Sequence, residues 1–190
     1  EAIPAEITLR PLDVDASPLV IVTLSDQRER LAREAEIRTL AFTDHMTGLA
    51  NRIAFQRDLD ARLSRHAADA KQRTVVILID LDQFKEVNDQ FGHSAGDAML
   101  KQVSQRLEAV FAAPALAARL GGDEFAAALT GQLSHDNVRL LGQKLLAALS
   151  RPVPFGDIMI SCSASIGIAI SDEERPTSEE LLKAADRAMY

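Results

Sequence analysis

The run Thr74–Asp80, with the sequence TVVILID, constrains the fold of this 190-residue chain more than any other feature. Its residues are mostly β-branched or aliphatic, and apolar side chains do not alternate with polar ones. A strand of this composition is typically central in a sheet and buried on both faces. The run therefore predicts an α/β domain built around a sheet that helices flank.

The segments around this strand alternate between helical and extended patterns from residue 41 onward. The expected elements are helices over 50–66, 96–111 and 137–149, strands over 115–120, 124–129 and 158–170, and a polar loop over 67–73. Gly121-Gly122 is expected to form the two-residue turn of a hairpin, and the capping box Thr177–Glu180 predicts a last helix. The order approximates βαββαβ with extra helices, a split βαβ layout.

The first 43 residues have a different character. Residues 1–24 predict two strands, which cannot bury a core alone, so we interpret them as the tail of an upstream domain. Residues 25–43 are charged and lack Gly and Pro, and their apolar heptad pattern is incomplete. Two interpretations stay open for this helix: a solvated linker and a parallel dimer stalk. The predicted domain boundaries are 1–24, 25–43 and 44–190.

Composition excludes several classes of protein. The formal charge is −7, from 21 basic and 28 acidic residues, so the broad basic face of a duplex nucleic-acid binder is not expected. Cys162 is the single cysteine, which excludes an internal disulfide and favours a reducing, cytoplasmic location. We see no membrane span or secretory signal, and both chain ends look like cuts through a longer protein, parts of which could tether it to a membrane.

Acidic residues end the central strand. Asp80 and Asp82 follow a hydrophobic run, where a carboxylate is costly unless something offsets its desolvation. A divalent cation such as Mg²⁺ can do so, because it binds a few carboxylates together with substrate phosphates, and the Leu81 carbonyl could join them. The alternative is a strand end that simply reaches water.

Two further segments carry polar residues that could form a site. Residues 88–97 are expected to be a loop with two glycines, in which Asn88 and Asp97 could read a guanine edge. The alternative for Asp97 is an ordinary helix cap. In the second segment, Asp123 and Glu124 follow the paired glycines, and Asp123 would approach Asp80 if this hairpin pairs beside the central strand.

These segments together resemble the GGDEF domain of diguanylate cyclases over residues 41–190. Gly121-Gly122-Asp123-Glu124-Phe125 is the family signature, and four companion blocks occur in the same order. The companion blocks are residues 44–52, 80–85, 88–97 and 182–190.

The resemblance implies a fold like that of class III nucleotidyl cyclases, with a central, mostly antiparallel sheet. It also implies that two protomers, each with one GTP and Mg²⁺ (or Mn²⁺), face each other as a homodimer. Each ribose 3′-hydroxyl attacks the α-phosphorus of the opposite GTP, which gives cyclic di-GMP and two pyrophosphates.

Roles for single residues also come from the resemblance. Asp80, the Leu81 carbonyl and Asp123 would hold metal, with Glu124 as a further metal ligand or acid/base group. Asn88 and Asp97 would recognise the guanine of GTP, with His93 close to the nucleotide. Lys85 and the backbone around Phe84 would contact the terminal phosphates. Gly121 and Gly122 would leave room for the nucleotide at the turn. Arg119 would order the signature loop or stabilise transition-state charge.

Two departures of this chain from the family pattern bear on its activity. Many members carry an inhibitory Arg-x-x-Asp motif, where this chain has Ala112 and Ala115, so no tight product-inhibition site of that type is expected. A basic segment that usually follows Tyr190 in the family and contacts phosphate is outside the chain, so this contact with GTP is not expected here. The first 43 residues resemble the last strands and signalling helix of a PAS sensor domain.

The main alternative is a GTP-binding regulatory module of a larger protein that also carries a cyclic di-GMP phosphodiesterase domain. An unrelated polymerase palm is disfavoured by the net charge of −7.

Overall fold

The structure is a computed structural model that describes residues 5–14, 17–66, 72–171 and 176–189. The chain divides into two compact units, Glu1–Ala41 and Phe42–Tyr190. Within the described residues, no helix is both long and apolar enough to span a bilayer.

The first unit contains a β-hairpin and most of a helix. Strands β1 (Ala5–Val14) and β2 (Ser17–Asp26) pair antiparallel from Ala5 opposite Asp26 to Val14 opposite Ser17, which confirms the two predicted strands. Apolar side chains of the hairpin, such as Ile7 and Leu9, are more than half exposed. Helix α1 (Arg28–Phe42) confirms the predicted helix. Its role as a linker or dimer stalk, and the PAS-like origin of the hairpin, stay predictions.

The second unit is built on a four-stranded sheet with the order β4-β5-β3-β8. Strand β3 (Arg73–Leu81) is central, and every neighbouring pair in the sheet is antiparallel. The other strands are β4 (Leu116–Gly121), β5 (Glu124–Gly131) and β8 (Ala164–Ile170). The expected mostly antiparallel α/β fold is thus confirmed.

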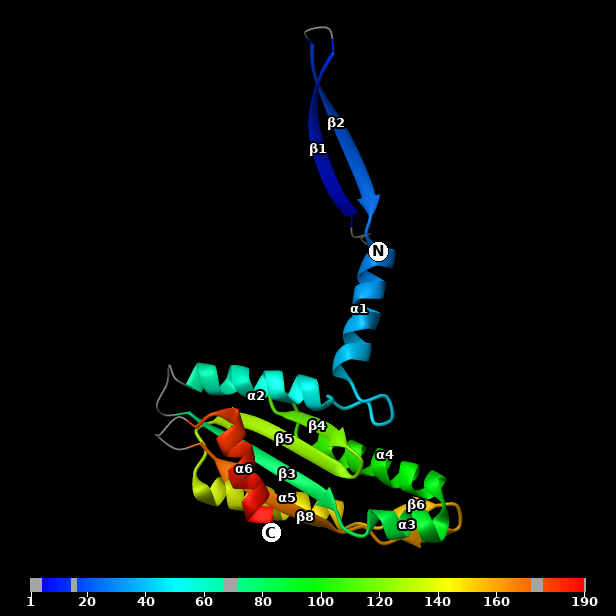
Figure 1. Ribbon diagram of the computed structural model, residues 1–190, viewed down its shortest axis with the longest axis vertical. Coiled ribbons are helices and arrows are strands. Elements are labelled where there is room, and N and C mark those ends of the chain that lie inside the picture. The colour runs from blue at the N-terminus through cyan, green and yellow to red at the C-terminus, as the bar shows by residue number, and fades with distance from the viewer. Residues whose placement is uncertain (1–4, 15–16, 67–71, 172–175, 190) are drawn as a thin grey trace. The chain divides into compact units, whose positions relative to one another are not determined.

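Helices cover both faces of this sheet (Figure 1). Helices α4 (His93–Val110) and α5 (His135–Leu149) pack with Val75, Ile77 and Ile79 in one core cluster. Helices α2 (Arg52–His66) and α6 (Ser178–Met189) pack with Val76 in a second cluster on the other face. Successive side chains of β3 therefore enter different cores, which is why the strand needs a continuous apolar run.

The structure corrects two expectations about secondary structure. Residues 88–97 are not a loop: Asn88 lies in helix α3 (Phe84–Phe91), and α4 begins at His93 directly after Gly92, whose φ is +85°. The strand expected over 158–170 is broken into β7 (Ile158–Ile160), which pairs with β6 (Val153–Phe155), and β8.

The break in that strand has a simple physical reason. Ile160, Cys162 and Ala164 are all buried in the same core cluster, so the side-chain alternation continues through the break. The backbone partner changes from β6 to β3 at the same point. A period-two pattern reports which side chains are buried and not which strand pairs with the backbone.

Two local predictions can be compared directly with the structure. The capping box before α6 is confirmed, since the Thr177 amide donates to Glu180 at 2.8 Å and the Glu180 amide donates to the Thr177 hydroxyl at 3.2 Å. Of the predicted polar loop over 67–73, residues 67–71 lie outside the described residues, and Arg73 already belongs to β3.

Candidate active site

The candidate site begins at a tight hairpin turn between β4 and β5. Gly121 pairs with Glu124, so the turn consists of Gly122 and Asp123, one residue later than expected. Both glycines have positive φ values, +141° and +56°. No atom outside the turn would contact a Cβ at either position, so these glycines serve backbone conformation and leave open space above the turn.

Pairing between β5 and β3 brings this turn to the acidic end of the central strand. Asp80 lies directly opposite Glu124 in the register. The Leu81 amide also donates to the Asp123 carbonyl at 3.3 Å. The expected approach of Asp123 to the end of the TVVILID strand, across 43 positions of sequence, is therefore confirmed.

The acids at this point repel one another. Burial raises the pKa of Asp80, and the negative charges of Asp123, Glu124 and Asp82 raise it further. Asp82 accepts a hydrogen bond from the Ser165 hydroxyl at 2.8 Å. A carboxylate such as Asp80, whose pKa is raised among acidic neighbours, favours a bound cation, because a nearby positive charge stabilises its ionised form.

The donor set fits a hard divalent cation. Asp80 and Asp123 supply carboxylate oxygens and Leu81 a carbonyl oxygen, which are the ligand types that Mg²⁺ prefers. Across the described ranges, no three or more His, Cys, Asp or Glu side chains are grouped to hold a metal by themselves. Mg²⁺ in proteins usually takes one or two carboxylates and completes its shell with substrate phosphates and water.

Arg119 holds the turn from the β4 side. Its Nε and Nη2 atoms donate to the Gly122 carbonyl at 3.0 and 2.7 Å, and Nη1 donates to the Asp44 carboxylate at 3.2 Å. The Arg119 side chain is only 10% exposed and that of Asp44 24%. The guanidinium therefore contacts the signature turn, as one of its two expected roles requires.

Asp44 is a partner that the sequence analysis did not assign. Burial alone would raise its pKa, yet hydrogen bonds from the Thr47 hydroxyl and amide, together with Arg119, hold the pKa below its usual value. Its carboxylate accepts from both Thr47 groups, at 2.7 and 2.9 Å. The sequence indicates residues 44–52 only as a family block. The signal that could have found this role is an acid in that block and an arginine just before the paired glycines, 75 positions apart.

The expected nucleotide-binding residues lie on two consecutive helices after β3. Phe84, Lys85 and Asn88 are on α3, whereas His93 and Asp97 are in the first turns of α4. Lys85 and His93 are exposed.

Gly96 allows these two helices to approach closely. A Cβ at this position would lie 2.2 Å from the Asn88 Oδ1 atom, which no side chain could tolerate without moving Asn88. The Asn88 side-chain Nδ2 also donates to the Phe84 carbonyl at 3.3 Å. Packing therefore holds Asn88 against the start of the helix that carries Asp97. That these two residues read guanine stays a prediction.

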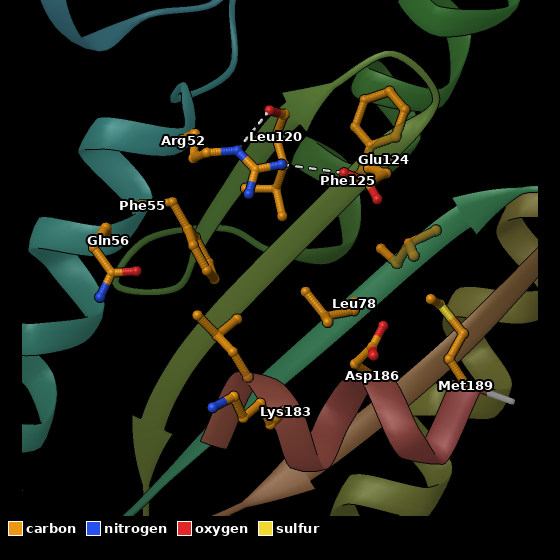
Figure 2. Close-up of a pocket in the computed structure, with 12 residues that line it drawn as sticks. Arg52, Phe55, Gln56, Leu78, Leu120, Glu124, Phe125, Lys183, Asp186 and Met189 are labelled. Carbon is orange, nitrogen blue, oxygen red and sulfur yellow. Dashed lines mark hydrogen bonds and ion pairs between the residues drawn. The ribbon is translucent and has the colours of Figure 1, made fainter. Parts of the chain in front are cut away.

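Arg52 is a second residue that the sequence analysis did not assign to the site. Its guanidinium bonds to the Leu120 carbonyl at 3.0 Å and to the Glu124 carboxylate at 3.1 Å (Figure 2). These residues lie at the edge of a cavity of about 270 Å³ between α2, α6 and the sheet. The cavity floor includes Phe55 and Leu78.

Comparison with known protein families gives one clear match. The model for "Diguanylate cyclase, GGDEF domain" matches residues 41–190. A solved structure of a sensory box/GGDEF family protein from Caulobacter crescentus superposes with a TM-score of 0.72 at 41% identity, over 78% of this chain and 95% of that one.

Curated relatives are longer than this chain. Diguanylate cyclase TpbB of Pseudomonas aeruginosa is 36% identical over 168 residues, which cover 88% of this chain and 37% of TpbB. Cyclic di-GMP phosphodiesterase PdeR of Escherichia coli is 39% identical over 162 residues, which cover 85% of this chain and 24% of PdeR. The chain thus spans about a quarter of the length of PdeR and just over a third of that of TpbB.

Proposed function

Since this chain belongs to the GGDEF domain family of diguanylate cyclases, we propose that it condenses two GTP molecules into cyclic di-GMP and two pyrophosphates. In each half-reaction a ribose 3′-hydroxyl loses its proton and forms a bond to the α-phosphorus of the other GTP. The bond between the α- and β-phosphates breaks, and pyrophosphate leaves. The observation that carries this proposal is the meeting of Asp80 and Asp123 at the end of β3.

Asp80, Asp123 and the Leu81 carbonyl would hold Mg²⁺ or Mn²⁺, and Glu124 would be a further metal ligand or acid/base group. The ion, when bound, would polarise the phosphoryl group and neutralise the charge that builds on it. The raised pKa of Asp80 among its acidic neighbours supports this assignment.

The remaining residues would bind and orient GTP. Asn88 and Asp97 would recognise the guanine edge, with His93 close to the nucleotide, and Lys85 and the backbone around Phe84 would contact the terminal phosphates. The open space above Gly121 and Gly122 would admit the nucleotide. Arg119 would keep the turn in place through the Gly122 carbonyl.

A homodimer would be part of the mechanism, because one protomer binds one GTP and so holds half of the reacting atoms. Rate would then come largely from positioning two bound substrates in line. α1 would be a suitable control element as a dimer stalk, since its Ile37 and Leu40 side chains are more than half exposed.

The test is to incubate the protein with GTP and Mg²⁺ at several enzyme concentrations and to separate the products. The expected result is one cyclic dinucleotide for every two pyrophosphates. The specific activity should increase with enzyme concentration. Equal specific activity across the dilution series, with only monomer in solution, would refute the dimer mechanism.

A second candidate is a GTP-binding regulatory module of a larger protein with a phosphodiesterase domain. The similarity to PdeR, a relative named as a phosphodiesterase, favours it. The same experiment separates the two candidates, because a regulatory module would bind GTP and release it unchanged.

A further inference from the structure

We propose that Arg52 is a positioning residue that fixes the signature turn, defined as Gly121–Glu124, and the direction of the Glu124 side chain. This inference rests on the proposed function for its effect on turnover. The geometric part stands on hydrogen bonds, ladder register and packing, and can be tested without turnover.

Arg52 binds the hairpin backbone where the strand ladder is irregular. The β4–β5 register shifts between Arg119 and Gly121, so Leu120 lies outside the regular pairing. The Leu120 carbonyl accepts a hydrogen bond from Arg52 Nε at 3.0 Å. Arg52 therefore adds a side-chain hydrogen bond to the backbone at the irregularity.

The same guanidinium reaches the far side of the turn. Arg52 Nη2 lies 3.1 Å from Glu124 Oε2, so one planar group ties the last part of β4 to the first residue of β5 (Figure 2). Lysine has the charge but not the fixed planar fork of donors, so it would hold these two partners in a less defined geometry.

The backbone around Arg52 is held by contacts with β4 and by buried residues of α2. Ala50, two residues before it, bridges to Ala118 of β4, and the Arg119 amide donates to the Ala50 carbonyl at 2.9 Å. On the other side, Phe55 and Leu59 of α2 are buried, with exposed fractions of 2% and 0%. The backbone that presents Arg52 is thus in register with the strand whose end Arg52 holds.

Close packing does not hold the turn on the side where Arg52 bonds to Leu120 and Glu124. Arg52, Leu120 and Glu124 line the cavity of about 270 Å³, so the turn has space rather than close-packed atoms on this side. The Arg52 and Glu124 side chains are also 64% and 52% exposed, and an ion pair at that exposure contributes little to global stability. The expected role is therefore local geometry.

The charge of Arg52 suits the position of Glu124. Glu124 lies opposite Asp80 and follows Asp123, two further acids. The second arginine at the turn, Arg119, is directed to Asp44 and the Gly122 carbonyl. Arg52 therefore offsets the repulsion that would otherwise turn Glu124 away from its neighbours.

The test compares Arg52→Ala, Arg52→Lys and the control Arg65→Ala. Arg65 lies on the same helix, is exposed, and donates to the Ala61 carbonyl within that helix. Two quantities are measured: hydrogen exchange of the amides of residues 121–124, and kcat and KM for GTP with Mg²⁺.

Arg52→Ala is expected to speed exchange at the turn and to lower kcat by up to about 100-fold with little change in KM, because misplaced groups affect the transition state most. Arg52→Lys should recover part of both losses, and Arg65→Ala should match the wild type. Wild-type exchange at the turn in Arg52→Ala would overturn the proposal, as would equal losses in the alanine variants of both arginines. If the wild type turns over no GTP, the proposed function fails, while the exchange measurement still tests the positioning role.

Discussion

Two hairpins in the second unit have the same two-residue turn sequence, Gly-Asp. The signature hairpin turns at Gly122-Asp123 and the β6–β7 hairpin at Gly156-Asp157, and the two glycines have φ values of +56° and +57°. Neither glycine has a neighbouring atom that a Cβ would meet. The local backbone requirement is therefore the same in both turns.

The surroundings of the two turns differ. β6 and β7 form a separate two-stranded sheet, and Met159 beside its turn is 63% exposed. The signature hairpin instead joins the central sheet through β3, and its turn is held by Arg119, Arg52 and the Leu81 amide. A Gly-Asp turn thus becomes a candidate site because of what the fold places around it.

The largest expected effect comes from exchanging the acid in each turn. Asp123→Asn should lower turnover by about 1,000-fold or more, because it removes a carboxylate that stabilises phosphoryl transfer through a metal. Asp157→Asn, in the matching turn, should leave turnover unchanged. Cyclic dinucleotide formation and circular dichroism melting are measured for both variants. Similar activity in the two would show that the acid of the signature turn has no special role in turnover.

The next effect concerns what holds the signature turn. Arg119→Ala removes charge-assisted hydrogen bonds and should lower the free energy of unfolding by about 2 kcal/mol. Its turnover should fall by about 100-fold because the turn is misplaced. Arg106→Ala is the matched control, since Arg106 donates to the carbonyls of Leu149, Arg151 and Pro152.

The control should lose stability but keep turnover when both are assayed well below their melting temperatures. Comparable turnover in the two arginine variants would show that the Arg119 contact with Gly122 has no special role.

A smaller effect is expected from the glycines themselves. Gly122→Ala and Gly156→Ala should each lower the free energy of unfolding by about 1 kcal/mol, because alanine is strained at these positive φ values. Only the Gly122 variant should also lose turnover. Urea unfolding and product assays distinguish a shared backbone cost from a functional one, and a turnover loss in Gly156→Ala would contradict that distinction.

The smallest effect is a pH dependence from Asp44. Its pKa in the folded protein is lowered below the usual 3.8, so its stabilising contribution is complete above that pH and is lost as pH falls through the folded value. The wild type should therefore be more stable than Asp44→Asn at pH 7, and the difference should shrink below pH 3.8. Thermal melting of both proteins across this range measures it, and a difference that grows toward low pH would reverse the assigned sign.

The sequence predicts the parts of this fold whose signals are local. The continuous apolar run identifies β3, the paired glycines identify a hairpin, and Thr177 with Glu180 identifies the start of α6. Each of these depends on residues within a few positions of one another. The turn lies one residue later than predicted. An error of this size is expected because the pairing register of the two strands sets which residues form the turn.

The missed features depend on tertiary packing and, for Arg52, on partners far apart in the sequence. Helix α3 is short and its segment leads into Gly92, so turn signals concealed a helix that packing against α4 stabilises. Arg52 bonds to residues 68 and 72 positions away, and one of the acceptors is the Leu120 backbone carbonyl at the irregularity of the ladder. No local pattern in the sequence encodes that carbonyl.

The central claim is that Asp80 and Asp123 form one cation site with bound nucleotide. Binding of Mn²⁺ in the presence of a non-hydrolysable GTP analogue, followed by electron paramagnetic resonance, tests it most directly. Asp80→Asn and Asp123→Asn are each expected to weaken Mn²⁺ binding by about tenfold or more, with Asp157→Asn unchanged. Wild-type Mn²⁺ affinity in both site variants would contradict the account.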